Sequence, residues 1–142
     1  MTRKRLLTVA TTIWLGVCMA AESTERFKTR LSTVAMDASM RITVAGTGAA
    51  SASLTGNRLT VEGSFEGLRS PATTAKLHLG RITGVRGPAV FDLKVAPATS
   101  GAISGAFDLT TDQVDDLRKG KFYIQINSEK APEGNLWGWL LR

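Results

Sequence analysis

The stretch Thr73-Thr-Ala-Lys-Leu-His-Leu-Gly80 carries the chain's only histidine, in a run where polar and apolar residues alternate strictly. The apolar members share one side of such a run and the polar members share the other: Ala75, Leu77 and Leu79 against Thr74, Lys76 and His78. This period of two is typical of a β-strand with one buried face. We therefore predict a half-buried strand here, and we look for the chemistry of the chain on its polar face.

Similar alternating runs lie on both sides of this strand. They cover residues 27–33, 42–54, 59–66, 89–95, 102–109, 122–127 and 135–141. Gly56-Asn57 separates two of them with a two-residue turn signal, which predicts a hairpin. A second turn is predicted over residues 131–134. In the run 122–127 we expect three buried residues and three on the opposite face: Phe122, Ile124 and Ile126 against Tyr123, Gln125 and Asn127.

One segment changes to a helical pattern. Thr110 or Thr111 suits the N-cap, Val114 and Leu117 share a face, and Gly120 suits the position that ends a helix. We predict one short helix over residues 111–119, as a connection between late strands. Some eight short strands with one helix favour an antiparallel sandwich or barrel. Of these we predict an antiparallel β-sandwich, with a Greek-key, immunoglobulin-like or superoxide-dismutase-like arrangement.

The N-terminal segment has the three regions of a secretory signal peptide. Basic residues 3–5 precede an apolar run over residues 6–17, and small residues Ala20 and Ala21 follow. The run is too short for a permanent membrane span. We predict that residues 1–21 are a signal peptide and that residues 22–142 are one exported domain, periplasmic or extracellular, without a transmembrane span. The alternative is lipidation at Cys18, against which bulky Val17 argues.

Cleavage after Ala20 or Ala21 would change the chemistry left in the mature chain. It removes Cys18, the only cysteine, and with it any disulfide or thiolate nucleophile. It also removes three of the 18 Lys and Arg residues, which leaves 15 against 12 Asp and Glu and lowers the net charge from +6 to +3. That charge is too mild to indicate nucleic-acid binding.

Several short motifs occur in a characteristic order along the chain. They are Gly67-Leu68, Ala75-x-x-His78-x-Gly80, Gly87, Leu109-Thr110 ahead of the predicted helix, and Pro132-x-Gly134 ahead of the last strand. In this order and spacing the chain resembles the CHRD domain, a module named for chordin and also found alone in secreted bacterial proteins. The resemblance runs from Phe27 to the end and implies a secreted domain.

The resemblance also implies three histidines, two in the central strand and one near the end. This chain has Lys76, His78 and Asn127 at those positions, and Gln125 where the family has Asn. Three imidazoles would suit copper or zinc, whereas one imidazole with an ammonium and carboxamides does not. We predict no metal and no cofactor. A copper- or zinc-handling protein that has lost most of its histidines is the alternative.

The sequence contains no set of residues that indicates catalysis. The single histidine has no Gly-x-Ser-x-Gly motif to accompany it, and Gly46-Thr47-Gly48 lies inside an alternating run with no helix after it. Glu62 and Glu66 share one strand face, where exposed acids are the common outcome. We predict that the chain is not an enzyme.

A binding role is suggested by two tryptophans in the last run. Trp137 and Trp139 lie opposite Leu136 and Leu140, at positions where the resemblance implies Arg and Gln. If exposed, they form a surface for a protein or glycan partner; the alternative is that a loop or a second sheet covers them. We predict a noncatalytic binding or structural module. Its candidate site residues are Trp137, Trp139, His78, Lys76, Tyr123, Gln125 and Asn127.

Overall fold

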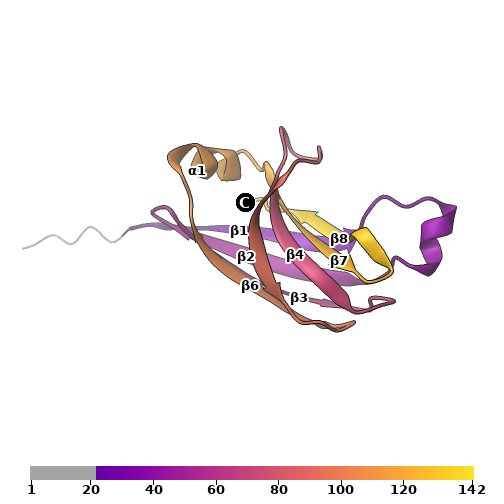
Figure 1. Ribbon diagram of the computed structural model, residues 1–142. Coiled ribbons are helices and arrows are strands. Elements are labelled where there is room, and N and C mark those ends of the chain that lie inside the picture. Colours follow the sequence, from indigo (N-terminus) through magenta and orange to yellow (C-terminus); the bar gives the residue numbers. More distant parts are fainter. Residues whose placement is uncertain (1–21) are drawn as a thin grey trace, which may run out of the picture.

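The computed structural model describes residues 22–142, which form eight strands, one 3-10 helix and one α-helix (Figure 1). The elements are β1 (Thr24–Thr33), η1 (Ala38–Ile42), β2 (Thr47–Thr55), β3 (Arg58–Glu66), β4 (Ala72–Leu79), β5 (Ala89–Val95), β6 (Gly101–Asp108), α1 (Thr111–Arg118), β7 (Phe122–Ser128) and β8 (Ala131–Trp139). The predicted signal peptide, its cleavage site and Cys18 lie outside the described residues. Neither helix of residues 22–142 has the length and apolarity needed to cross a bilayer.

The strands form a closed antiparallel barrel in the order β1-β2-β3-β6-β5-β4-β7-β8. The predicted sandwich was therefore wrong, although the all-β class, the antiparallel pairing and the single α-helix are confirmed. Closure depends on two short joints, where β1 meets β8 and where β5 meets β6, each with two ladder pairs. Alternation along a strand shows which face is buried, but it carries no information on whether two sheet edges pair with each other.

The barrel interior is filled by the apolar side chains of the alternating runs. In β4, Ala75 and Leu77 are buried in this core, while Lys76 and His78 lie on the outer face and are half-buried. The prediction for the opening stretch is thus confirmed. Other strands contribute the largest fully buried side chains of the core: Phe27, Leu31, Leu54, Leu59, Ile103, Phe122, Ile124, Ile126 and Leu136.

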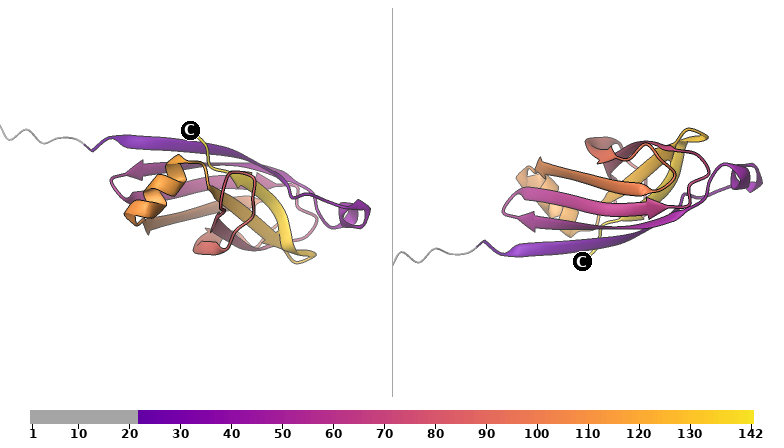
Figure 2. Two further views of the ribbon diagram at one scale, coloured as in Figure 1. Left: turned by 90° about the horizontal axis from the view of Figure 1, so that it is seen from above. Right: turned by 90° about the horizontal axis from the view of Figure 1, so that it is seen from below.

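Helix α1 covers one end of the barrel, and η1 lies beyond the other end (Figure 2). The predicted helix is confirmed with its cap. The hydroxyl of Thr110 accepts a hydrogen bond from the backbone N–H of Gln113, whose side chain accepts one from the Thr110 N–H. Val114 and Leu117 point into the core. Because α1 buries only these apolar residues, it acts as a lid on the core and not as a second layer.

The predicted boundaries differ from the structure most at β2 and β8. The run 42–54 becomes a strand only from Thr47, because Asp37 caps η1 ahead of it by accepting hydrogen bonds from the N–H groups of Ser39 and Met40. The turn predicted over residues 131–134 lies instead at residues 129–130. Residues 131–134 belong to β8, where the register with β7 shifts and Gly134 has a φ of 142°.

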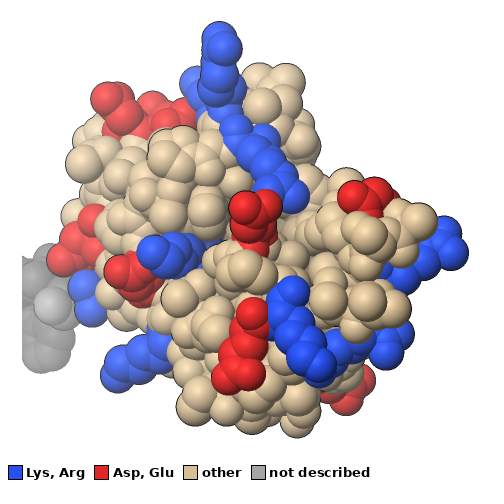
Figure 3. All heavy atoms as spheres, turned by 45° about the vertical axis from the view of Figure 1, so that its right-hand side comes forward, with Lys and Arg blue, Asp and Glu red and all other residues tan. Residues whose placement is uncertain are grey.

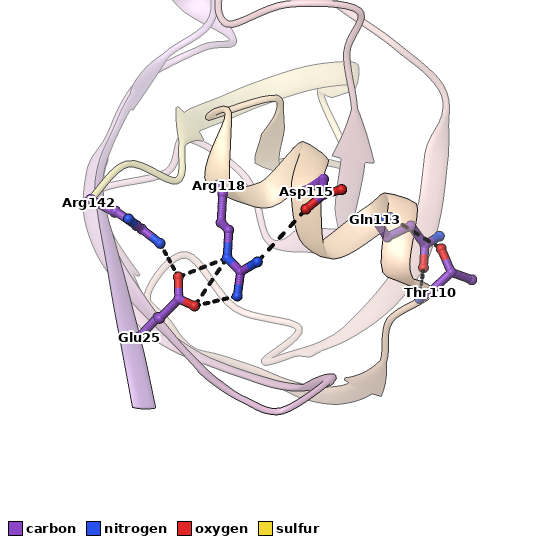
Figure 4. A network of polar contacts seen from close by, with 6 residues as sticks. All are labelled: Glu25, Thr110, Gln113, Asp115, Arg118 and Arg142. Carbon is purple, nitrogen blue, oxygen red and sulfur yellow. Dashed lines mark hydrogen bonds and ion pairs between the residues drawn. The ribbon is translucent and has the colours of Figure 1, made fainter. Parts of the chain in front are cut away.

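Ion pairs connect the start of β1 to α1 and to the C-terminal residue. The Glu25 carboxylate accepts hydrogen bonds from Arg118 at 2.6 and 3.1 Å, and it also pairs with Arg142 (Figure 4). Arg118 in turn lies 3.8 Å from Asp115. Hydrogen bonding from Arg118, and then from Arg142, lowers the pKa of Glu25 below its ordinary value.

Candidate functional site

The seven predicted site residues all lie on the outer face of β4, β7 and β8. Antiparallel pairing places them in three rows across the strands. The rows are His78, Tyr123 and Trp139; then Lys76, Gln125 and Trp137; then Thr74 with Asn127. Residues two apart on a strand share a face. The same alternation that keeps these residues out of the core therefore places them side by side on the outer face of three paired strands.

Tyr123 is the centre of an aromatic cluster on this face. Its ring stacks on His78 at a centroid distance of 4.8 Å, contacts Trp139 at 4.4 Å in a tilted arrangement, and meets Trp137 edge-on at 6.1 Å. Only 1% of the Tyr123 surface is exposed. Strand β7 is therefore buried on both faces, a feature that its period-two pattern did not indicate.

The loop over residues 81–88, between β4 and β5, covers part of this cluster. The Tyr123 hydroxyl donates to the carbonyl oxygen of Gly87 at 3.0 Å and accepts from the Gly87 N–H at 3.1 Å. His78 Nδ1 lies 2.9 Å from the same carbonyl, which can only accept, so this nitrogen carries the hydrogen. A Cβ at Gly87 would overlap the carbonyl oxygen of Leu79, so the loop can approach this closely only with glycine there.

The two tryptophans are half-buried, and their surroundings differ. The guanidinium of Arg86, from the same loop, lies 4.7 Å above the Trp137 ring. Trp137 also packs against a small apolar cluster, formed by Val34, Val44 and Ala131 with Met40 of η1. The alternative to full exposure was coverage by a loop. Trp137 is covered in this way in part, by Arg86 of the 81–88 loop. Trp139 contacts Tyr123 and lines an open groove.

The polar side chains of the face mostly pair with one another. Gln125 is buried and donates from Nε2 to Asn127 Oδ1 at 3.0 Å and to the carbonyl oxygen of Glu133 at 3.2 Å. The Lys76 ammonium lies 3.4 Å from Asp92 of β5. These contacts satisfy the hydrogen-bonding groups of a closely packed surface.

The positions at which the resemblance implies histidines do not form a metal site in this chain. His78 lies opposite Tyr123, whereas Asn127 lies opposite Thr74, four residues away along β4. Lys76, between them, brings a cation that forms an ion pair. Within residues 22–142 no group of three or more His, Cys, Asp or Glu converges on one point. One imidazole beside an ammonium does not fit copper or zinc.

A groove of about 350 Å³ runs along the joint between β1 and β8. It is lined by Lys28, Thr29, Arg30, Ser32, Trp137, Gly138, Trp139 and Leu141. Ser32 pairs with Trp137, and Lys28 pairs with Leu141, so Arg30 falls opposite Trp139. Sequence reasoning missed the β1 half of this groove. Its signal was the alternation of Arg26, Lys28 and Arg30, but only barrel closure brings that basic face beside the tryptophans.

Comparison with known families agrees with the order of motifs. A family model described as the CHRD domain matches residues 28–140, from within β1 to just past β8. The chain belongs to the CHRD family. The match covers the barrel except for the first residues of β1, and it places the chain with domains of an extracellular type. No curated protein and no solved structure matches this CHRD domain significantly.

In this CHRD domain the outer face has two chemically different parts. Around Tyr123, the imidazole, phenol and carboxamide groups hold one another and the 81–88 loop in place. Along the β1/β8 groove, two indoles and two basic side chains border open space. The groups around Tyr123 can hold the 81–88 loop in one conformation. The side chains along the groove can contact another molecule.

Proposed function

We propose that this CHRD domain is a noncatalytic binding module that acts outside the cytoplasm and holds its partner in the β1/β8 groove. The observation that carries the proposal is the half-buried Trp139 ring, which lines the groove while Tyr123 supports it at 4.4 Å. A ring that is fixed before binding loses little conformational entropy when a partner covers it. A sugar or a protein side chain could use such a ring.

The chemistry of the groove supports binding over catalysis. Its lining residues supply two basic groups, two hydroxyls and two indoles, but neither a carboxylate nor an imidazole. His78, the only imidazole, is stacked on Tyr123 and bonded to Gly87, so it serves the packing of the loop. General acid and base chemistry usually needs such groups within reach of a substrate.

The charge pattern supports a partner other than nucleic acid. Figure 3 shows basic and acidic side chains interspersed over the face that it displays, without one continuous basic surface. Several of the cations belong to ion pairs, such as Arg58 with Asp108 and Lys121 with Asp116. Export, which the first 21 residues predict from their sequence, would place the groove in the periplasm or outside the cell.

Tryptophan fluorescence offers a direct test, because Trp14, Trp137 and Trp139 are the only tryptophans of the chain. In a Trp14→Phe background, all tryptophan emission comes from the two groove residues. We expect the emission to change in a saturable way with at least one member of a panel of neutral oligosaccharides, acidic oligosaccharides and peptides. We expect Trp139→Ala to weaken binding by about tenfold or more, measured by calorimetry, while thermal unfolding stays cooperative.

Ile82→Ala is the matched control, since Ile82 is an apolar side chain that is 62% exposed and lies outside the groove. This variant should bind as the parent protein does. Equal binding by the parent and by Trp139→Ala would exclude the groove as the binding site. A panel without a single saturable response would contradict the binding function itself.

A further inference from the structure

We infer that the β1/β8 groove recognises an acidic sugar, a pyranose unit that carries a carboxylate, within a polysaccharide chain. The inference rests on the proposed binding function and names the class of ligand. Its basis is the combination of one open indole with two basic side chains at the same joint of the barrel.

Trp139 provides the platform for the sugar ring. One part of its indole is supported by Tyr123, and Gly80 lies close enough that a Cβ there would be 3.0 Å from the Trp139 ring. The ring is thus backed by the barrel and by the start of the 81–88 loop, while its remaining surface lines the groove. A pyranose presents a face of C–H groups, which packs on an indole as an apolar surface does.

Arg30 and Lys28 provide the charge that an acidic sugar needs. Both point outward from β1, both are exposed, and Arg30 lies opposite Trp139 by register. Neither forms an ion pair with any residue of the described chain. A guanidinium donates two parallel hydrogen bonds to a carboxylate, and the ammonium two residues along the same strand adds a second cation about 7 Å away.

The surroundings of the groove favour an anion over a neutral ligand. No acidic side chain lines it, so a carboxylate would meet no like charge. Arg86 lies above Trp137 and adds a third cation beside the groove. The Trp137 ring is already covered by this arginine and by the apolar cluster with Met40, which leaves Trp139 as the platform.

The fold argues against an acidic peptide as the occupant. Peptides commonly bind β-proteins by adding a strand to a free sheet edge, and the closed barrel leaves only three residues unpaired on each side of this joint, 29–31 and 138–140. The groove has a volume of about 350 Å³, which suits one or two sugar rings along the joint. A sugar can be held by the platform and the two cations without any strand pairing.

The test uses the Trp14→Phe protein and pairs of oligosaccharides that differ only in charge. Hexamers of galacturonate, mannuronate and glucuronate are each compared with the same hexamer in which every carboxyl is methyl-esterified. We expect at least one acidic hexamer to change the tryptophan emission saturably and to bind about tenfold or more tightly than its ester, a difference that declines with added salt.

Charge variants locate the contact. Arg30→Gln and Lys28→Gln should each weaken binding of the acidic hexamer by about fivefold to tenfold and leave binding of the ester unchanged. Lys94→Gln is the matched control, because Lys94 is an exposed lysine on β5, away from the groove. Loss of affinity in the control equal to that in the groove variants would overturn the assignment.

The outcomes separate this inference from the proposed function. If a neutral sugar or a peptide binds in a Trp139-dependent way and no acidic hexamer exceeds its ester, the binding function stands and the acidic-sugar inference is overturned. If binding of every probe is indifferent to Trp139→Ala, both fall. If the acidic hexamers are preferred and that preference is lost in Arg30→Gln, both are supported.

Discussion

Tyr123 determines how the outer face of β7 is organised. Its ring contacts His78 and Trp139, and its hydroxyl forms two hydrogen bonds with the backbone of Gly87. A buried hydroxyl with both partners satisfied adds stability and also specifies one arrangement of the loop. The position of Trp139 in the groove therefore depends on a residue that does not line the groove itself.

At the same scale, Glu25 makes the stability of the protein depend on pH. Hydrogen bonding from Arg118 and Arg142 lowers the pKa of Glu25 in the folded state. The carboxylate thus stabilises the fold at pH values above its unfolded-state pKa, and this contribution is lost as the pH falls through the lower folded-state value. The side chain is partly exposed, so the effect is modest.

We expect Glu25→Gln to be less stable than the parent protein near neutral pH and to approach it in stability as the pH falls through the lowered folded-state pKa of Glu25. Urea unfolding at a series of pH values measures this difference. Glu62→Gln serves as the control, because Glu62 is exposed and belongs to no ion pair of the described chain. A constant difference between Glu25→Gln and the parent at all pH values would contradict the role given to this carboxylate.

Among the elements, β8 is the strand whose side chains are most constrained by their neighbours. Its outer face carries Trp137 and Trp139, its inner face carries Leu136, and β1 approaches it closely at Gly138. A Cβ on Gly138 would overlap the Thr29 side chain and lie 2.6 Å from the carbonyl oxygen of Arg30. Only glycine allows this approach, so Gly138 helps to set the width of the groove.

We predict that Gly138→Ala destabilises the protein by about 1–3 kcal/mol, because the added methyl group must push β1 away from β8. Urea unfolding measures the loss, and the tryptophan emission of the folded variant reports the displaced Trp139. Ser104→Ala, at an exposed position of β6, should have a much smaller effect. Wild-type stability in Gly138→Ala would show that the joint adapts without cost.

At the scale of the whole molecule, the barrel consists of two well-paired sheets with two short joints. The ladders β1/β2, β2/β3 and β3/β6 contain eight, nine and eight pairs, whereas β1/β8 and β5/β6 contain two each. In the described chain no ladder pair joins residues 29–31 to residues 138–140. Local opening should therefore begin at the joints.

Native-state hydrogen exchange tests this difference. We expect the amide protons of Arg30 and Trp139, at the interrupted part of the β1/β8 joint, to exchange at least about tenfold faster than those of Ala52 and Val61 in the β2/β3 ladder. Uniform protection across all four residues would indicate a joint as rigid as the sheets. A ligand held in the groove should slow exchange at the joint, because it binds the closed form.

The sequence by itself determined the features that depend on near neighbours along the chain. Alternation predicted the strands and the buried face of β4, the capping residues predicted α1, and the order of motifs indicated the CHRD family, now shown by the match to residues 28–140. It also singled out Trp137 and Trp139 and placed them on the face opposite the core. The prediction was wrong at residues 131–134. The proline and glycine there indicated a turn, but these residues lie inside β8, where the register with β7 shifts.

Only the tertiary structure decided what lies beside that face. A period of two shows which side of a strand is buried. It does not show which strand pairs with β8, and it does not show that the 81–88 loop covers Tyr123. Closure of the barrel sets β1 against β8 and so brings Arg30 opposite Trp139. The two halves of the groove are about a hundred residues apart in sequence, and only long-range strand pairing brings them together.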